Sequence, residues 1–155
     1  MKPEAFLKRS KDIEREIKKA LKSSVDVGIV NGNYGQEIYD GLTVVEVGAG
    51  HEYGVGDLPQ RSFLRMPFEL KQSELTRYIA NQFKRLESGR TDTRTALGRV
   101  GVMARNISVG AFDNGGYGQW ADISQMTKDA KGSASILIDT GTLRNSITWR
   151  VNSDS

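Results

Sequence analysis

The chain of 155 residues contains no cysteine and a single histidine, His51. Without cysteine there is no disulfide, no thiolate metal site and no cysteine nucleophile, a composition typical of proteins kept in a reducing compartment. A zinc-protease helix needs a second histidine four residues after the first, and that position is Val55. Because no other histidine or cysteine completes a zinc site, the sequence predicts no metal and no cofactor.

Glycine motifs that carry catalysis are missing as well. There is no Gly-x-Ser-x-Gly elbow, and the glycine pairs at 48 and 50 and at 54 and 56 match no phosphate-binding fingerprint. No set of residues supplies a nucleophile, a base and an oxyanion site together. We therefore expect a protein that acts by binding and is not an enzyme.

Long apolar runs are also absent. No stretch approaches the roughly 20 residues that cross a bilayer, and the N-terminus lacks the apolar core of a secretory signal. We expect a soluble chain without a membrane partner, made and kept in the cytoplasm. Its length suits one domain, residues 1–155, with a core of its own.

The net charge of +3 is small, but it is unevenly distributed. Residues 1–24 sum to +4, residues 25–59 to −6 and residues 60–110 to +6. Solvated helix faces would explain this pattern. A head-to-tail contact between an acidic and a basic flank would also explain it, and such contacts close into rings or continue as filaments. A nucleic-acid-binding module using the basic segment 60–110 is a further alternative, although stacking aromatics are not interleaved there.

Hydrophobic spacing predicts an α+β fold, with about three helices packed on a small, mostly antiparallel sheet. The first helix is expected at 3–23 and the second from Pro67 to about Leu86. The third would be capped by Thr91 or Thr93 and would bury Leu97, Val100, Ala104 and Ile107.

Strands and loops are expected between these helices. Alternation or β-branched residues predict strands at 25–30, 136–138 and 146–151. Valines favour a strand at 42–47 too, whereas Gly48 and Gly50 disfavour a long helix there, and both alternatives stay open. Segments rich in glycine and polar residues predict mobile loops near 31–41, 113–118 and 131–135.

One motif carries catalytic chemistry in other proteins. Asp139-Thr140-Gly141 follows an apolar run, as in the catalytic strand of an aspartic protease. A dimer would be needed, because two aspartates must share one proton. Only fourteen residues follow Gly141, whereas such proteases build their flap and most of their sheet after this motif. The alternative is a turn that the Asp139 carboxylate holds by accepting backbone N–H groups, with Leu143 and Ile147 packed beneath it.

Several segments, read in order, resemble one family. His51-Glu52-Tyr53-Gly54, followed by Leu58-Pro59-Gln60-Arg61-Ser62-Phe63-Leu64, is similar to the "His-Glu-aromatic-Gly … Ile-Pro-x-Arg-x-Phe-Leu" signature of tailed-phage morphogenesis proteins. The resemblance continues through Trp120, Ser124, Thr127 and Lys131. It ends with Ile136-Leu137-Ile138-Asp139-Thr140-Gly141, then Leu143, Ser146 and Ile147. The family comprises the tail-completion and minor tail proteins of the head–tail junction.

The resemblance implies a structural virion protein with an α+β domain that assembles as a ring in the neck or upper tail. It would bind copies of itself and neighbours such as the tail terminator, the tail tube or the head connector. It would be found in the virion, and in the host cytoplasm during assembly. Whether it touches DNA in a lumen is left open. The candidate structural or interface residues are His51, Glu52, Tyr53, Gly54, Pro59, Arg61, Phe63, Leu64, Trp120, Asp139, Thr140, Gly141 and Leu143.

Roles can be assigned to some of these residues from their chemistry. Pro59 fixes the entry to the next segment, and Arg61 can clamp a carboxylate in a fork. Phe63 and Leu64 can anchor in the core. Trp120 is expected as a lid over the core, with an anchor for a partner as the alternative.

Overall fold

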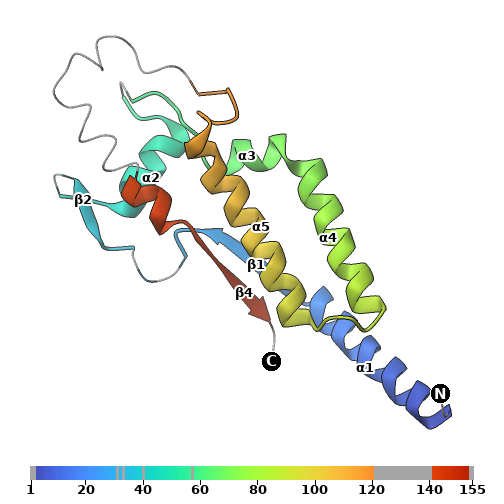
Figure 1. The fold of residues 1–155 in the computed structure, drawn as a ribbon. Helices are drawn as coiled ribbons and strands as arrows, with labels where there is room; N and C mark the ends of the chain where they lie inside the picture. Colours follow the sequence, from blue (N-terminus) through green and yellow to red (C-terminus); the bar gives the residue numbers. More distant parts are fainter. Residues whose placement is uncertain are drawn as a thin grey trace.

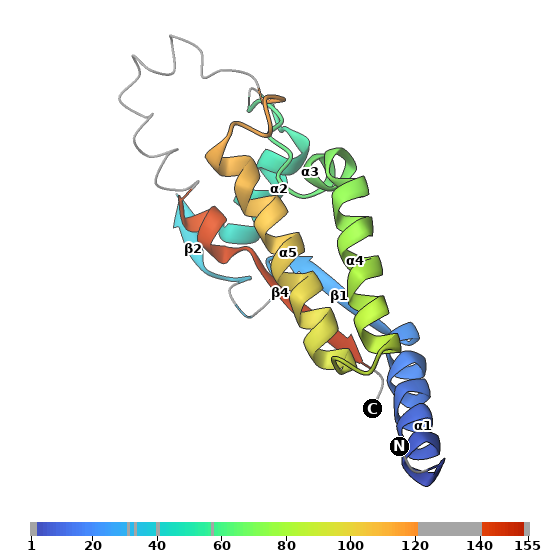
Figure 2. The same cartoon turned by 45° about the vertical axis from the view of Figure 1, so that its right-hand side comes forward.

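The central element of the fold is the long helix α5 (Thr93–Asp113). In the computed structural model, which describes residues 3–30, 32, 34–39, 41–56, 58–120 and 141–153, α5 contacts α4 on one side and a two-stranded ribbon on the other. Figures 1 and 2 show one strand of the ribbon crossing behind α5 and the other running beside it, with α1 extending beyond the far end of the molecule. The expected α+β class is confirmed, because helices dominate and the strands pair antiparallel.

The ribbon joins the two ends of the chain. Helix α1 (Pro3–Leu21) ends two residues earlier than expected, and Ser23 already lies in β1 (Ser23–Gly28). This strand pairs antiparallel with β4 (Thr148–Ser153), in a register that runs from Ser23 opposite Ser153 to Gly28 opposite Thr148. Both strands are therefore present, each displaced by two residues from its predicted range.

The ambiguous stretch 42–50 is mainly helical. A short strand pair, β2 (Glu37–Tyr39) and β3 (Leu42–Thr43), leads directly into α2 (Val44–Tyr53). Thr43 and Glu46 form a capping box, in which each side chain bonds the other residue's backbone N–H. The strand β2 also lies inside the stretch 31–41, which was expected to be a loop.

Glycine inside α2 allows close packing instead of breaking the helix. A Cβ on Gly48 would lie 3.1 Å from Leu143 Cδ1 and 3.2 Å from Ile29 Cδ1. The low helix propensity of glycine is thus offset by the approach of α2 to the core.

The predicted second helix is two helices. Helix α3 (Arg65–Leu70) and helix α4 (Gln72–Glu87) are separated at Lys71, whose φ of −101° and ψ of 11° are not those of a regular helix. Pro67 lies inside α3 and is buried, so the first helix of the pair begins two residues before it.

Helix α5 begins with an aspartate cap instead of a threonine cap. The Asp92 side chain accepts from the Thr95 N–H at 2.9 Å. Thr93, which is 1% exposed, ties α5 to α1: its N–H donates to Glu16 Oε2 at 2.8 Å and its hydroxyl to the Glu16 carbonyl at 2.7 Å. The four residues predicted on the buried face of α5 are all buried.

The contact between Thr93 and Glu16 makes the stability of the fold depend on pH. The Thr93 N–H, donating to the carboxylate, holds the pKa of Glu16 below its ordinary value of 4.5. The pKa of Glu16 is lower in the folded protein than in the unfolded chain. The stabilisation that its contact with Thr93 provides is therefore fully present above pH 4.5 and is lost as the pH falls through the folded pKa. We expect Glu16→Gln to lower the free energy of urea unfolding at neutral pH and to have little effect well below pH 4.5. An equal loss at both pH values would contradict this.

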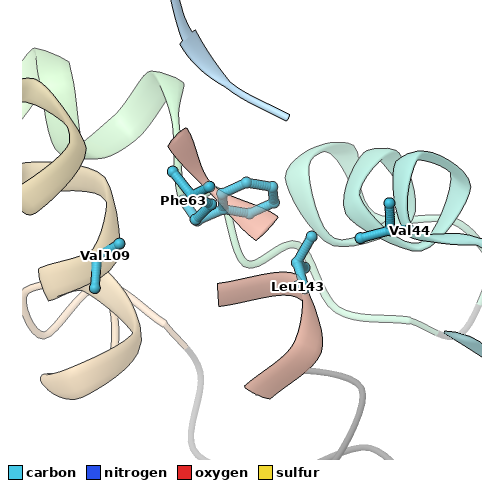
Figure 3. Close-up of a cluster of buried hydrophobic side chains, with 5 residues drawn as sticks. Val44, Phe63, Val109 and Leu143 are labelled. Carbon is cyan, nitrogen blue, oxygen red and sulfur yellow. The ribbon is translucent and has the colours of Figure 1, made fainter. Parts of the chain in front are cut away.

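Two buried clusters hold these elements together. The smaller one, near the α1 end, joins Ala20, Leu86 and Ala96. The larger one surrounds Phe63, and Figure 3 shows Val44, Val109 and Leu143 reaching it from three different helical segments. Leu143 lies in a helical turn formed by residues 141–146. The predicted strand 136–138 and the loop 131–135 lie outside the described residues.

Candidate functional site

Among the described residues, polar contacts are concentrated at the buried side chain of Glu52, near the end of α2. It is 6% exposed. One oxygen accepts from the Ser62 hydroxyl at 2.8 Å and from the Arg65 N–H at 3.0 Å. The other accepts from the N–H groups of Phe63 at 2.8 Å and Leu64 at 3.0 Å. Four donors therefore face the two oxygens, and the side chain acts as an acceptor in all four contacts.

These donors include the backbone at the start of α3. The first N–H groups of a helix have no partner within it, so they need an outside acceptor. Glu52 supplies that acceptor from ten to thirteen residues upstream. Ser62 adds a second cap, because its hydroxyl oxygen accepts from the Met66 N–H at 3.0 Å. Glu52 therefore joins the end of α2 to the start of α3.

The carbonyl groups of the same segment are held from other elements. The Ser108 hydroxyl of α5 donates to the Phe63 carbonyl at 2.7 Å, and the Trp120 indole N–H donates to the Ser62 carbonyl at 3.1 Å. The Arg61 N–H donates to the His51 carbonyl at 2.7 Å. Segment 61–66 is thus fixed by α2, α5 and the loop after α5.

The turn between α2 and this segment explains the glycine of the signature. Gly54 has a φ of 73°, which favours glycine, and a Cβ there would lie 3.1 Å from the Gln60 backbone nitrogen. The Gln60 side chain closes the turn by donating to the Glu52 carbonyl at 3.1 Å. Pro59, in the same turn, is exposed. The guanidinium carbon of Arg65 lies 5.3 Å from the ring centre of Tyr53, which is also exposed.

The aromatic residues form a row from the core to the surface. Phe63 is 1% exposed, and its ring centre is 5.3 Å from that of Phe112. Phe112 in turn meets Trp120 edge to face at 5.4 Å. Trp120 is half-buried against the larger core cluster. This position agrees with a lid over the core.

The C-terminal part of the signature reaches the same place. Leu143 and Ile147 are fully buried in the cluster around Phe63. The Ile147 carbonyl accepts from the Arg105 guanidinium at 2.8 Å, and Arg144 forms an ion pair with Asp113. Gly141 begins the helical turn 141–146, so at this residue the chain is already helical. Asp139 and Thr140, together with Ser124, Thr127 and Lys131, lie outside the described residues.

The structure also places three further residues of the predicted set, His51, Arg61 and Leu64. His51 is 7% exposed and lies at the end of α2, so it belongs to the interior of the fold. None of the ion pairs among the described residues involves Arg61, whose expected carboxylate clamp is therefore absent from that part of the chain. Leu64 is half-buried and packs against the core cluster.

Sequence reasoning missed three contributors. Ser108 was hidden in an apolar stripe, and its only signal was a small polar residue between buried positions of α5. The pair Thr43 and Glu46 has the Thr-x-x-Glu spacing of a capping box, which would have favoured a helix at α2. Trp149 of β4 lies against Gly98 and Gly101 of α5, where a Cβ on Gly101 would be 2.6 Å from the indole ring.

The surface also contains an apolar groove of about 380 Å³, beside β1. Phe68 of α3 and Leu75 and Ile79 of α4 line it, as do Val25 and Val27 of β1. No group of three or more histidine, aspartate and glutamate residues that could hold a metal ion occurs in the described part of the chain. Within the same residues, no helix has the length and apolar character needed to cross a membrane.

Comparisons with family models, with curated proteins and with solved structures find no match.

Proposed function

We propose that this chain is a structural protein of the head–tail junction of a tailed phage or prophage, of the tail-completion or neck type. It would form a homo-oligomeric ring that joins the tail to the head or terminates the tail. Its partners would be copies of itself and neighbouring neck or tail proteins, in the virion and, during assembly, in the host cytoplasm.

The observation that carries the proposal is the place of the signature residues in the fold. Glu52, Phe63, Leu143 and Ile147 come from distant parts of the sequence and are all buried. Phe63, Leu143 and Ile147 pack in one cluster, and Glu52 bonds the backbone of Phe63 directly. A set of residues that builds a core and fixes a helix start is what a family of structural domains would share. The residues that carry the resemblance would therefore account for a shared fold. Surface residues would determine which partners the protein binds.

The distribution of charge supports assembly with copies of the chain. The acidic segment 25–59 begins in β1, next to α1, and continues through β2, β3 and α2, which lie at the opposite end of the molecule from α1 in both views (Figures 1 and 2). Residues 1–24, which include α1, sum to +4, whereas 25–59 sum to −6. An elongated subunit with ends of opposite charge favours heterologous, head-to-tail association.

The proposal predicts that the chain is a stoichiometric component of phage particles and oligomerises. We expect mass spectrometry of purified particles to detect it in several copies per virion, and native mass spectrometry of the isolated protein to give a closed oligomer of one size. A chain that is strictly monomeric and absent from purified particles would contradict the proposal. Detection in particles is a stronger test than oligomerisation of the isolated protein, because a ring can require neighbouring neck or tail proteins in order to form.

A further inference from the structure

Exposed apolar side chains occur at several places on the surface, and two pairs of them lie at opposite ends of the molecule. At one end are Phe6, 61% exposed, and Leu7, 59% exposed, in the first turns of α1. At the other end are Leu42, 43% exposed, and Val45, 38% exposed, at the junction of β3 with α2. Apolar patches next to charged residues are typical of surfaces that bind another protein.

The first two turns of α1 extend beyond the rest of the protein, as both views show (Figures 1 and 2). Contact with the body begins at Arg9, which donates to the Ser88 carbonyl at 3.0 Å, and at Ile13, which lies beside Gly89. Phe6 borders a hollow of about 280 Å³ between α1 and the end of α4, with space for an apolar side chain of a partner. Lys8 and Lys11 are exposed on the same helical turns. We call residues 3–11 the arm.

The opposite surface is acidic and held in position. Glu37 accepts from the Gly41 N–H at 2.9 Å, and Glu46 accepts from the Thr43 N–H at 2.8 Å. Both glutamates are exposed, and no lysine or arginine occurs between residues 23 and 60. We call the surface formed by Glu37, Leu42, Val45 and Glu46 the acidic ledge. Because backbone groups fix its carboxylates, little side-chain freedom is lost when a cation binds.

We infer that the arm of one copy docks on the acidic ledge of the next copy. This contact rests on the proposed ring and names the surfaces that build it. Phe6 and Leu7 would cover Leu42 and Val45, and Lys8 and Lys11 would face Glu37 and Glu46. Each copy carries both halves of the contact at opposite ends, so the contact is heterologous and repeats around a closed assembly.

Cysteine cross-linking tests this contact directly, because the native chain contains no cysteine. Leu7→Cys protein is mixed with Val45→Cys protein under mild oxidation, and a disulfide-linked heterodimer is expected. Mixing Leu7→Cys with Val102→Cys, an exposed position on α5, is the matched control and should give at least about tenfold less product. A chain carrying both Leu7→Cys and Val45→Cys should give a ladder of linked copies.

Surface variants provide a second measurement. Phe6→Ser combined with Leu7→Ser is expected to weaken self-association at least about tenfold while the melting temperature is unchanged, because both side chains are exposed. Glu46→Gln keeps a residue that can complete the capping box and removes one charge of the ledge. It should therefore reduce the salt dependence of self-association without melting α2.

The outcomes separate this contact from the proposed function. Rings that persist in the Phe6→Ser, Leu7→Ser variant, or equal cross-linking to Val45→Cys and Val102→Cys, would overturn the contact and leave the proposed function standing. Preferential Leu7→Cys homodimers would indicate a symmetric pairing of arms and would overturn the proposed contact. The contact would also be overturned if the Phe6→Ser, Leu7→Ser variant loses binding to duplex DNA but still self-associates. A chain that stays monomeric and unlinked at millimolar concentration overturns the contact even if particles contain the protein.

Discussion

Glu52→Gln is expected to lower the free energy of unfolding by about 3 kcal/mol or more. The carboxylate is buried and accepts four hydrogen bonds from the backbone and side chain of residues 62–65. A glutamine keeps one accepting oxygen, and its NH₂ group then faces two donors that have no other partner. Urea denaturation followed by circular dichroism measures the change.

A matched control is available six residues upstream, in the same helix. Glu46 also caps backbone N–H groups, but it is exposed, and glutamine can replace it in a capping box. Glu46→Gln should therefore change the free energy of unfolding by less than about 0.5 kcal/mol. Equal effects of the two substitutions would show that Glu52 does not fix the junction of α2 and α3.

Gly101→Ala is expected to destabilise the protein by about 2 kcal/mol, although alanine is the better helix former. A Cβ at this position would lie 2.6 Å from Trp149 Cδ2 and Cε3, so either the indole or β4 must move. Thermal unfolding of the purified variant measures the loss. The indole is part of the contact between the ribbon and α5, and its displacement should also change the fluorescence of Trp149.

Gly98→Ala is the paired control, because it faces the same indole one turn earlier. A Cβ there would meet Trp149 Cη2 at 3.4 Å, an ordinary van der Waals distance. This variant should be neutral, or more stable by up to about 1 kcal/mol through its higher helix propensity. If both alanines destabilise equally, helix packing around Trp149 differs from that described.

Features that depend on neighbouring residues were predicted well from the sequence. The buried stripe of α5 from Leu97 to Ile107 follows a period of 3.6, and its four members are buried as expected. The burial of Leu143 and Ile147 was also expected. Local patterns of this kind are decided by spacing alone, which is why α1, α5 and the helical region of α3 and α4 were predicted, whereas α2 was left open.

Features that depend on contacts between distant residues were not predicted from the sequence. The pairing of β1 with β4 joins residues about 125 positions apart, and no short-range pattern specifies it. The position of α2 was left open because valines and glycines were weighed by propensity, whereas packing of Gly48 against Leu143 favours the helix. Glu52 was picked out by resemblance, but its role required knowing that residues 62–65 fold back over it.

The structure also changes how the charge pattern is read. The sum of −6 for residues 25–59 includes Glu52, which is buried and satisfied internally, and Asp26, which forms an ion pair with Arg150 on the partner strand. Within segment 25–59, the exposed acidic side chains that the structure describes are Glu37 and Glu46 of the acidic ledge. Charge segregation along the sequence therefore becomes a smaller, better defined surface in the fold.

Electron microscopy of phage particles is the most direct test of the proposed role, with the chain located by an antibody or by its density. We predict a ring of identical copies between the portal end of the head and the tail, with the signature residues inside each subunit. Particles that assemble complete necks without this protein, in a strain from which its gene has been deleted, would contradict the proposal.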